Sequence, residues 1–526
     1  MASFPSPKSV IFNNFKGIRT RNGIAGEGTI SATTCQNVDF LPSSFDAGID
    51  IKTTLGNYKY CELSDTYEGY NIIKGFEFET ENGKLLIFYC ENTSNGILLK
   101  YDGTNGFIAI IDDTYDLTVT GQANGITMID NAYNTFIFTN GVEYYAYCPD
   151  SELPENVIQQ LEPEYDGNPI TGLSLAEQDG SLVIGCNEGL VLASRKGDIT
   201  DFDYVTPTDI NKAWYQLFGK KVTAVVPYID SLLVFTQEDS TVLSGNFSTT
   251  SGTRYDASLG GCMSFESWCK HDKYLFFYDN KQKNIYYYMQ NDFGQKVLGE
   301  PIAPEVQKFF NNVTKLQIVS YVGNNRSEIW FLANNFKLIY DYYVSEWSER
   351  VCQNLTSYFV YDNDVYSTGG AKCFIEKAGN TCIFDGEFYP ATYAMQLINL
   401  GSFSNMKEME FQPLISVSSD YNNTFDIDCE IDGKKVKSKR IKMYNQGAVW
   451  GDDEAQTAAT PDNEIWDVQY YPDESDKVIQ QVKGKFISNW YYLRFIIKTT
   501  QRGDDFAITQ FELKGITQET DTTGRK

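Results

Sequence analysis

Carboxylates are the most numerous side chains in this sequence that could take part in chemistry. The chain carries 70 acidic and 43 basic residues, which gives a formal net charge of −27. Some acids stand in close pairs, such as Asp112/Asp113, Asp201/Asp203 and Asp452/Asp453. A glycosidase needs two carboxyl groups at a set separation, one acting as an acid and the other as a base or nucleophile. In so acidic a chain such pairs arise by chance, so we interpret these as solvated loop residues.

Three further carboxylates, Asp426, Asp428 and Asp432, lie close enough in the sequence to bind a hard cation such as Ca²⁺. Asp426 and Asp428 alternate with apolar residues in the stretch FDIDCEID. Successive side chains of a strand point to opposite faces, so the alternation predicts that both aspartates lie on the exposed face of a strand. Calcium bound on surface turns stays open as the alternative. We expect no metal site and no cofactor.

Histidine and cysteine chemistry has little support. The one histidine, His271, lies in WCKHDKYLFF, which predicts an exposed position at a turn between two strands. One histidine is too few for most zinc sites and for histidine-dependent nucleophilic triads. The 11 cysteines form no CxxC pair, and several lie inside strand patterns, which predicts buried free thiols. No glycine-rich phosphate loop stands between a strand and a helix, and we expect the protein not to be an enzyme.

One cluster of basic residues stands out against this acidic background. It consists of Lys434, Lys435, Lys437, Lys439, Arg440 and Lys442, and we call it the basic cluster. Two interpretations stay open: a solvated strand face, or a docking surface for an acidic neighbour, which could be another copy of the chain. In the second case the charges would set the register and the rate of association more than the affinity.

Short apolar runs joined by polar turns must position all of these groups. The pattern occurs twice between Ile170 and Gly245, and similar units begin at Gly75, Gly125, Cys262, Leu316 and Thr356. About seven copies at a spacing of roughly 40 to 53 residues are typical of propeller blades. The sequence therefore predicts an all-β fold with a β-propeller of about seven blades, or six. A large antiparallel sandwich would have no reason to repeat a unit of nearly constant length.

The repeats divide the chain into four expected parts. These are an N-terminal strand and arm that complete the propeller (1–50), the β-propeller (51–390), a C-terminal β-sandwich-like domain (391–516) and a flexible tail (517–526). Within them, Val10–Phe15 is the expected closing strand. Short helices are expected around Ile30–Asn37 and at Trp214–Phe218, a long acidic loop at 450–477, and a hairpin turn at Asp432-Gly433.

The net charge also limits the partners. Wrapping nucleic acid requires clustered Lys and Arg that neutralise phosphates, and an acidic surface argues against it. Nucleic acid that slides past without binding is not excluded. The N-terminal stretch MASFPSPKSV has no apolar core of a signal peptide, and no run approaches the 18 to 20 or so apolar residues of a membrane span. We therefore expect synthesis in a cytoplasm and no membrane span.

Several stretches resemble one known family. They are FNNFKGIRTRNG with GTISATTCQNVDF near the N-terminus, LVLASRKGDITDFDY and KVTAVVPYIDSLLVFTQEDSTVLSG in the centre, YDYYVSEWSER, and the C-terminal NWYYLRFIIKTTQRGDDFAITQFELKG. Together they are similar to the tail propeller proteins of short-tailed (podovirus-type) bacteriophages, of the packaged-DNA stabilisation or tail nozzle (muzzle) kind. The resemblance spans most of the chain and lies in the strand pattern.

The resemblance implies a structural protein of the virion tail, assembled in the host cytoplasm. It implies a homo-hexameric ring below the portal and adaptor proteins, with tail fibre or tailspike proteins as further neighbours. Such a ring retains packaged DNA and then forms a conduit for its ejection, without reading its sequence. An acidic lumen would repel phosphate, in agreement with the net charge. Ring closure requires head-to-tail contacts, for which we expect the C-terminal domain and aromatic residues at blade edges.

Two other classes of function stay open. A carbohydrate-binding or carbohydrate-cleaving propeller would use aromatic side chains near its mouth, such as Trp268 or Trp347, to stack on sugars. A generic interaction scaffold of a bacterial cell would form no ring and would not associate with virions.

Overall fold

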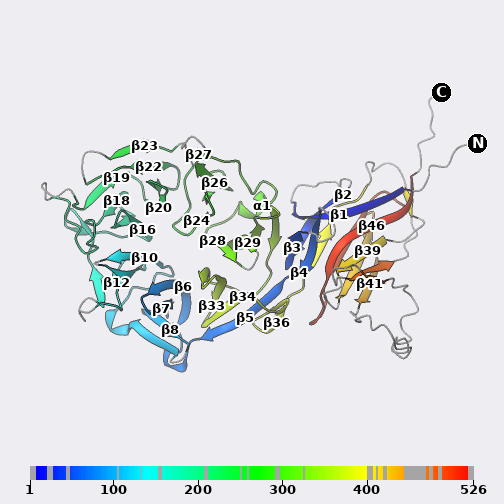
Figure 1. Ribbon diagram of the computed structural model, residues 1–526, viewed down its shortest axis with the longest axis horizontal. Helices are drawn as coiled ribbons and strands as arrows, with labels where there is room; N and C mark the ends of the chain where they lie inside the picture. The colour runs from blue at the N-terminus through cyan, green and yellow to red at the C-terminus, as the bar shows by residue number, and fades with distance from the viewer. Residues whose placement is uncertain are drawn as a thin grey trace, which may run out of the picture. The chain divides into compact units, whose positions relative to one another are not determined.

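The computed structural model is built almost entirely of β-strands (Figure 1). It describes residues 8–19, 28–42, 48–103, 106–130, 132–151, 157–205, 211–248, 252–257, 260–290, 296–323, 326–399, 407–409, 413–418, 423–443, 470–472, 478–483 and 489–518. The exceptions in these ranges are a four-residue α-helix, α1 (Gln307–Phe310), and two 3₁₀ turns, η1 (Asp65–Tyr67) and η2 (Asp113–Tyr115).

The chain divides into two compact units. Unit 1 contains Met1–Asn57, Leu338–Cys352 and Lys377–Lys526, and unit 2 contains Tyr58–Lys337 and Gln353–Glu376. Unit 2 is thus made of two nearly consecutive stretches, whereas unit 1 gathers segments from both ends of the chain and from between residues 338 and 352.

Unit 2 is built on six four-stranded antiparallel sheets. The first four are β6–β9 (Asn71–Thr80, Gly83–Glu91, Gly96–Asp102, Gly106–Ile111), β10–β13 (Asn124–Asp130, Tyr133–Thr139, Tyr144–Tyr147, Ile158–Leu161), β16–β19 (Ser174–Gln178, Ser181–Gly185, Leu190–Ala193, Trp214–Leu217) and β20–β23 (Ala224–Tyr228, Ser231–Phe235, Ser240–Ser244, Thr253–Asp256). The fifth is β24–β27 (Trp268–His271, Tyr274–Asp279, Asn284–Gln290, Lys296–Leu298) and the sixth joins β32–β34 (Ser357–Tyr361, Asp364–Gly369, Lys372–Thr381) to β5 (Leu55–Glu62). A two-stranded hairpin, β14–β15 (Glu164–Tyr165, Asn168–Pro169), follows the second sheet.

The first strands of these sheets form a closed ring. Contacts run from β6 to β10, β16 and β20, from β24 to β28 (Leu316–Gly323) and β32, and back to β6. Between β20 and β24, the Thr223 hydroxyl donates to the Cys262 carbonyl oxygen at 2.8 Å. The hairpin of β28 and β29 (Arg326–Ala333) takes the seventh position in the ring. Figure 1 shows the sheets arranged radially, and the predicted β-propeller is confirmed.

Apolar side chains fill the space between neighbouring sheets. Each apolar cluster of unit 2 combines residues of two adjacent blades, as where Phe76 of β6 meets Phe136 of β11 with ring centroids 5.5 Å apart. Close packing also accounts for Gly75, where a Cβ atom would lie 2.5 Å from the ring of Phe359 in the neighbouring blade. The repeating hairpins therefore share one continuous core, as repeat architectures require.

A strand from the N-terminal side of the propeller completes its last blade, but it is not the predicted one. The sixth sheet receives β5 as its outer strand beside β34. The predicted closing strand, Val10–Phe15, lies in β1 (Lys8–Ile18), which pairs with β2 (Gly28–Gln36) and β46 (Ala507–Gln518) in unit 1. The described strands of this N-terminal segment therefore pair with C-terminal strands in unit 1, and not with the sheets of the propeller.

Unit 1 pairs strands that are distant in the sequence. Its other strands are β3 (Val38–Pro42), β4 (Ile49–Thr53), β30 (Lys337–Asp341), β31 (Glu346–Glu349), β35 (Ile383–Phe384), β36 (Glu387–Phe388), β37 (Thr392–Met395), β38 (Lys407–Met409), β39 (Pro413–Ser418), β40 (Asn423–Ile431), β41 (Lys434–Met443), β42 (Tyr470–Pro472), β43 (Val478–Lys483), β44 (Asn489–Trp490) and β45 (Leu493–Lys498). β2 pairs with β37, β37 with β45, β45 with β40, and β46 with both β1 and β39. Phe12 and Phe495 both pack on Phe511, at centroid distances of 6.4 and 4.8 Å.

Local expectations had mixed outcomes. The turn at Asp432-Gly433 is confirmed, because Ile431 pairs with Lys434 and both turn residues have positive φ, 48° and 77°. The helix expected around Ile30–Asn37 is the strand β2 instead. The helix expected at Trp214–Phe218 is the outer strand β19, which pairs with β18. In both places pairing with a neighbouring strand overrides the local spacing.

Two expectations fall largely on residues outside the described ranges. Of the acidic loop at 450–477, the structure describes only 470–472, which form β42. The predicted tail begins inside β46, which continues to Gln518, and residues 519–526 lie outside the described part of the chain.

Candidate functional site

The basic cluster lies on β41, beside the Asp432-Gly433 turn. Lys434 and Lys435 are exposed next to the turn, and Arg440 is half-buried further along the strand. Lys437, Lys439 and Lys442 occupy register positions opposite Cys429, Ile427 and Thr424 of β40, and their side chains are outside the described part of the structure.

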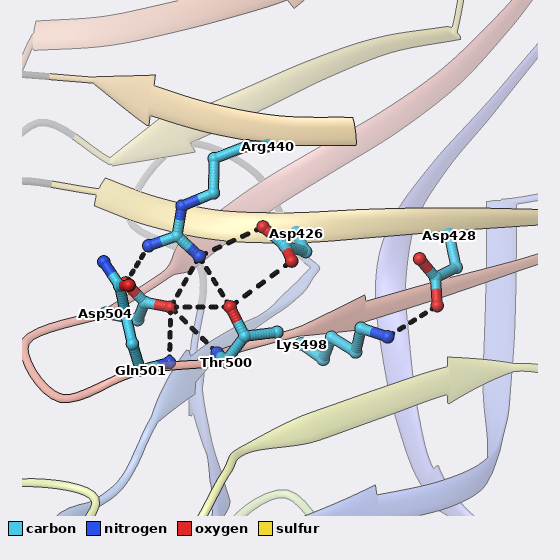
Figure 2. Close-up of polar contacts among 7 residues, drawn as sticks. All are labelled: Asp426, Asp428, Arg440, Lys498, Thr500, Gln501 and Asp504. Atoms are coloured by element: carbon cyan, nitrogen blue, oxygen red, sulfur yellow. Dashed lines mark hydrogen bonds and ion pairs between the residues drawn. The ribbon is translucent and has the colours of Figure 1, made fainter. Parts of the chain in front are cut away.

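Arg440 is the centre of a polar network inside unit 1 (Figure 2). Its Nη1 donates to Asp426 Oδ1 at 3.1 Å and to Asp504 Oδ2 at 2.8 Å, and its Nη2 donates to the other oxygen of Asp504. Asp504 is 1% exposed and also accepts the backbone N–H groups of Thr500 and Gln501. Burial by itself would raise the pKa of Asp504, but the hydrogen bonds from Arg440 and the two backbone groups outweigh it and lower that pKa.

Asp428 is neutralised in the same sheet. Its Oδ2 is 2.6 Å from Lys498 Nζ and 2.8 Å from Lys435 Nζ. Asp428 is 4% exposed because β45 lies alongside β40, with Ile496 directly opposite Asp428. The prediction that Asp426 and Asp428 form an exposed strand face was therefore wrong: these carboxylates hold β40, β41 and β45 together through buried charges.

The third carboxylate considered as a cation ligand, Asp432, also has a structural role. Its Oδ1 accepts the backbone N–H groups of Tyr491 and Tyr492, each at 3.0 Å, which fixes the hairpin turn. Within the described ranges no group of three or more His, Cys, Asp or Glu side chains is arranged to hold a metal ion. Of the basic cluster, Arg440 and Lys435 are thus engaged inside unit 1, and Lys434 is presented at the surface beside the turn.

Unit 2 contains a cavity of about 300 Å³ between the inner strands of its ring. Its polar and aromatic lining includes Lys74, Asn124, Phe265, Glu266, Trp268 and Gln317. Lys74 of β6 and Glu266, two residues before β24, form an ion pair of 2.6 Å, and their side chains are 13% and 10% exposed. Because β6 and β24 are not neighbours in the ring, this pair bridges the inner space of the propeller. The Lys74 ammonium also lies 5.0 Å from the ring centroid of Phe265.

Most other polar groups of the cavity lining are bound within the protein. Asn124 Nδ2 donates to the Leu173 carbonyl oxygen of the next blade at 2.8 Å. The Gln317 amide donates to the Tyr358 carbonyl oxygen and accepts the Tyr358 N–H, both at 2.8 Å, which joins β28 to β32. The indole Nε1 of Trp268 is different, because it is buried and has no hydrogen-bond partner. Most polar groups of the cavity lining are therefore fixed, and the unused donor of Trp268 has almost no accessible surface.

His271 is buried rather than exposed, contrary to the prediction. It is the last residue of β24, and the turn begins one residue later at Asp272. Its ring nitrogens lie 2.9 Å from Ser320 Oγ and 2.7 Å from Ser327 Oγ of the hairpin β28–β29. Desolvation lowers the pKa of His271, and the neighbouring Asp272 carboxylate partly opposes it. The residue links two blades.

The other residues singled out from the sequence are placed as follows. All 11 cysteines are free, and all but the half-buried Cys352 are buried, as predicted. Burial raises the pKa of the Cys262 thiol to about 11. Asp112 caps the turn η2 through the backbone N–H of Thr114, and Asp201 lies 3.5 Å from Arg195. Asp452 and Asp453 lie outside the described residues.

Only a weak signal in the sequence indicates the cavity. Two of its polar residues, Lys74 and Asn124, each precede a glycine near the start of an inner strand, in KGF and NGI. That shared position marks residues near the ring centre. Glu266 and Trp268 come from the segment leading into β24, and nothing in their local pattern indicates that they meet Lys74.

Comparisons with known proteins return fold neighbours only. No protein-family model matches the chain, and no curated protein matches it either. Among solved structures, the chain is similar to the extracellular domain of the putative hybrid two component system BT4673 from B. thetaiotaomicron, with 12% identity and a TM-score of 0.40 over 60% of this chain and 39% of that one. The chain thus spans well under half the length of this relative.

Two further neighbours are BBS1N in its complex with ARL6DN and the WD40 domain of Neurospora crassa Pan2. BBS1N has 12% identity and a TM-score of 0.37, over 62% of this chain and 100% of its own. The Pan2 domain has 10% identity and a TM-score of 0.35, over 62% of this chain and 94% of its own. With TM-scores this low, none of these likenesses supports a functional assignment. In the described part of the chain no helix has the length and apolarity needed to cross a membrane.

Proposed function

We propose that this chain is a structural virion protein of a bacteriophage tail. In this proposal copies form a homo-hexameric ring below the portal and adaptor proteins, retain packaged DNA and line an acidic conduit for its ejection. The protein is not an enzyme in this account, and its further neighbours are tail fibre or tailspike proteins. The family resemblance of the strand pattern and the net charge of −27 support the proposal.

The observation that carries the proposal most is how the propeller is held together. Polar side chains at the ring centre bond to backbone groups of neighbouring blades, through Asn124, Thr223 and Gln317. The ion pair between Lys74 and Glu266 then spans the space between blades that are not adjacent. These polar groups bond within the protein and hold the blades in place. A rigid propeller of this kind suits a mechanical component of an assembly better than a reaction site.

This geometry also restricts where DNA would pass. A cavity of about 300 Å³ that is bridged by a buried ion pair is far too small for a duplex. In the proposed ring the conduit therefore runs between copies of the chain, not along the axis of each propeller. Carboxylates on that wall would repel phosphate and hold no DNA by counterion release, so the duplex could slide.

The proposal is tested by the mass of the purified full-length chain and by its presence in virions. Native mass spectrometry should find six copies, and peptide mass spectrometry of purified phage particles should find the chain among tail components. A monomer at every concentration, together with absence from the particles, would contradict the proposal.

A second candidate function is favoured by one observation. Trp268 lines the cavity, where its ring could stack on a sugar, and a small movement of the side chain would bring its buried, unpartnered indole N–H to a sugar hydroxyl. Trp347, the other tryptophan considered for this role, is 1% exposed and packs on Tyr340, so it is not free to stack on a sugar. A glycan array of the wild type and of Trp268→Phe separates the candidates: the structural proposal expects no specific binding by either protein.

A further inference from the structure

Seven equivalent turns lie on one face of the propeller. Each joins the inner strand of the ring to the next strand in its sheet, and they follow Thr80, Asp130, Gln178, Tyr228, His271, Gly323 and Tyr361. Inner strands of a propeller run in the same direction along its axis, so their turns share one face. We call this the first-turn face. Later turns of the blades reach it too, since the Glu81 N–H donates to Asp150 at 3.1 Å.

Most turns of the first-turn face carry a carboxylate, although Lys273 lies in the same turn as Asp272 and Lys84 is 3.5 Å from Asp362. Five of the turns carry an exposed carboxylate: Glu81, Asp179, Asp230, Asp272 and Asp362. A sixth carries the half-buried Asp130. Asp179, Asp272 and Asp362 have φ values of 52°, 53° and 47°, which aspartate tolerates well, so turn geometry explains part of this pattern. The acids alone therefore identify no partner.

Exposed aliphatic residues on the same face are not explained by turn geometry. Ile129, Ile229 and Val322 are 65%, 65% and 61% exposed, at every second position around the ring. Ile229 has a φ of 57°, a conformation that is costly for a β-branched side chain and easy for asparagine or glycine. Each of these side chains would add buried apolar area to a contact that covers this face.

The same chain carries a surface of opposite charge. The β40–β41 hairpin presents Lys434 at the surface beside its turn, next to Lys435, which is ion-paired with Asp428. Asp432, the one acid in that turn, is bound to the backbone of Tyr491 and Tyr492, which holds the turn in place. An exposed lysine beside a fixed turn is complementary to a face of carboxylates.

We infer that the first-turn face of one copy binds the β40–β41 hairpin of a second copy. The inference rests on the self-assembly in the proposed function and adds to it the two surfaces that meet. The two surfaces differ, so the contact is head-to-tail and can close into a ring. The aliphatic residues contribute buried apolar area, while the carboxylates and lysines set the register and the rate of association.

Conservative variants test the acidic partner surface. The double variant Asp230→Asn/Asp272→Asn removes two charges and keeps the turns, since asparagine tolerates positive φ as aspartate does. Asp116→Asn is the matched control, because Asp116 is exposed, has a φ of 57° and lies in a connection between blades, on the opposite face. Sedimentation at low salt should show self-association weakened about tenfold in the double variant and unchanged in the control.

The variant Ile229→Asn distinguishes an effect on self-association from an effect on folding stability. It should weaken self-association about tenfold and at the same time raise the unfolding temperature, because asparagine relieves the strained φ. A purely structural residue would not move these two measurements in opposite directions. Equal self-association in Ile229→Asn and the wild type would overturn the inference.

A charge exchange tests the pairing itself. Lys434→Glu should weaken self-association, and adding Asp230→Lys in the same chain should restore it. If the wild type assembles but none of these variants changes its assembly, the surfaces are wrong and the proposed function stands. If the variants instead lose only the binding of a different virion protein, the second copy is the wrong partner. If the wild type never self-associates, both the inference and the proposed ring fail.

Discussion

The two units of this chain form their all-β cores in opposite ways. In unit 2 most sheets consist of consecutive strands, and most apolar clusters lie between blades that follow one another in the sequence. In unit 1 the strands that meet are hundreds of residues apart, as where Phe12 of β1 faces Phe511 of β46. Unit 2 is therefore specified by local repeats, and unit 1 depends on contacts that bring both chain ends together.

Both units contain buried as well as exposed charges. Unit 2 leaves many carboxylates exposed at its turns, where they cost little, but it also buries others such as Asp279. Unit 1 buries Asp428 and Asp504, which are bound by Lys498 and Arg440. Removing one member of a buried network leaves an uncompensated charge, so such substitutions should destabilise either unit more than substitutions at exposed turns do.

The largest expected effect comes from breaking the long-range packing of unit 1. Phe12 is 1% exposed, and Phe12→Ala should cost unit 1 about 3–5 kcal/mol of unfolding free energy, through lost contact and the cavity left behind. Hydrogen exchange resolved by segment measures it, with Phe12→Leu as a milder control. Equal loss of protection in the blades of unit 2 would show that the two units are not independent.

The next effect concerns the charge network of Figure 2. Arg440→Ala leaves Asp504 buried without its guanidinium partner and should destabilise unit 1 by about 3 kcal/mol. Lys434→Ala, on the same strand but exposed, should stay within about 0.5 kcal/mol. Denaturant unfolding compares the two variants. Similar values for both would mean that the network contributes little to stability.

A smaller effect is expected at the centre of the propeller. Lys74→Met removes the ammonium partner of the Glu266 carboxylate and should destabilise unit 2 by about 2 kcal/mol. The double variant Lys74→Met/Glu266→Leu should recover most of this loss, because apolar pairs replace buried ion pairs at little cost. The coupling comes from a double-mutant cycle. Additive losses would indicate that the two residues do not act as a pair.

The smallest effect is a pH response of opposite sign in the two units. In unit 2, desolvation is the main reason why the pKa of His271 lies below its ordinary value of 6.5. Its contribution to the free energy of unfolding is therefore complete above pH 6.5 and is lost as the pH falls toward the pKa of the folded state. In unit 1, burial raises the pKa of Asp505 from 3.8 to about 6. Its contribution to the free energy of unfolding is therefore present at low pH and is lost as the pH rises through about 6.

Between pH 7 and pH 5, unit 1 should therefore gain stability from Asp505 while unit 2 loses stability from His271. Segment-resolved hydrogen exchange at both pH values measures this, and His271→Gln and Asp505→Asn should each flatten the response of their own unit. A change of the same sign in both units, unaffected by the variants, would contradict the assigned groups.

The same contrast explains what could be predicted from the sequence. The blades were predictable because the pattern of a hairpin lies within a short stretch of sequence, in apolar runs such as Leu232–Thr236 and turns such as Asp179-Gly180. The closing strand was misplaced because Val10–Phe15 and β5 both have strand patterns, and only distant pairing decides which one joins the propeller. For the same reason Trp214–Phe218 was expected to be helical although it pairs with β18.

At the candidate sites, residue types were easier to predict than environments. The basic cluster and the Asp432-Gly433 turn were found from the sequence. The burial of Asp428 and His271 was not, because the covering strands β45 and β28–β29 come from other parts of the chain. Alternation shows that a strand has two faces, but it does not show what covers the polar one.

The most direct test of the central claim is a cryo-EM reconstruction of the assembled full-length protein. We expect a closed ring of six copies whose lumen is lined by carboxylates, with each propeller axis blocked at Lys74 and Glu266. A monomer, or a ring whose lumen is lined by basic residues, would contradict it.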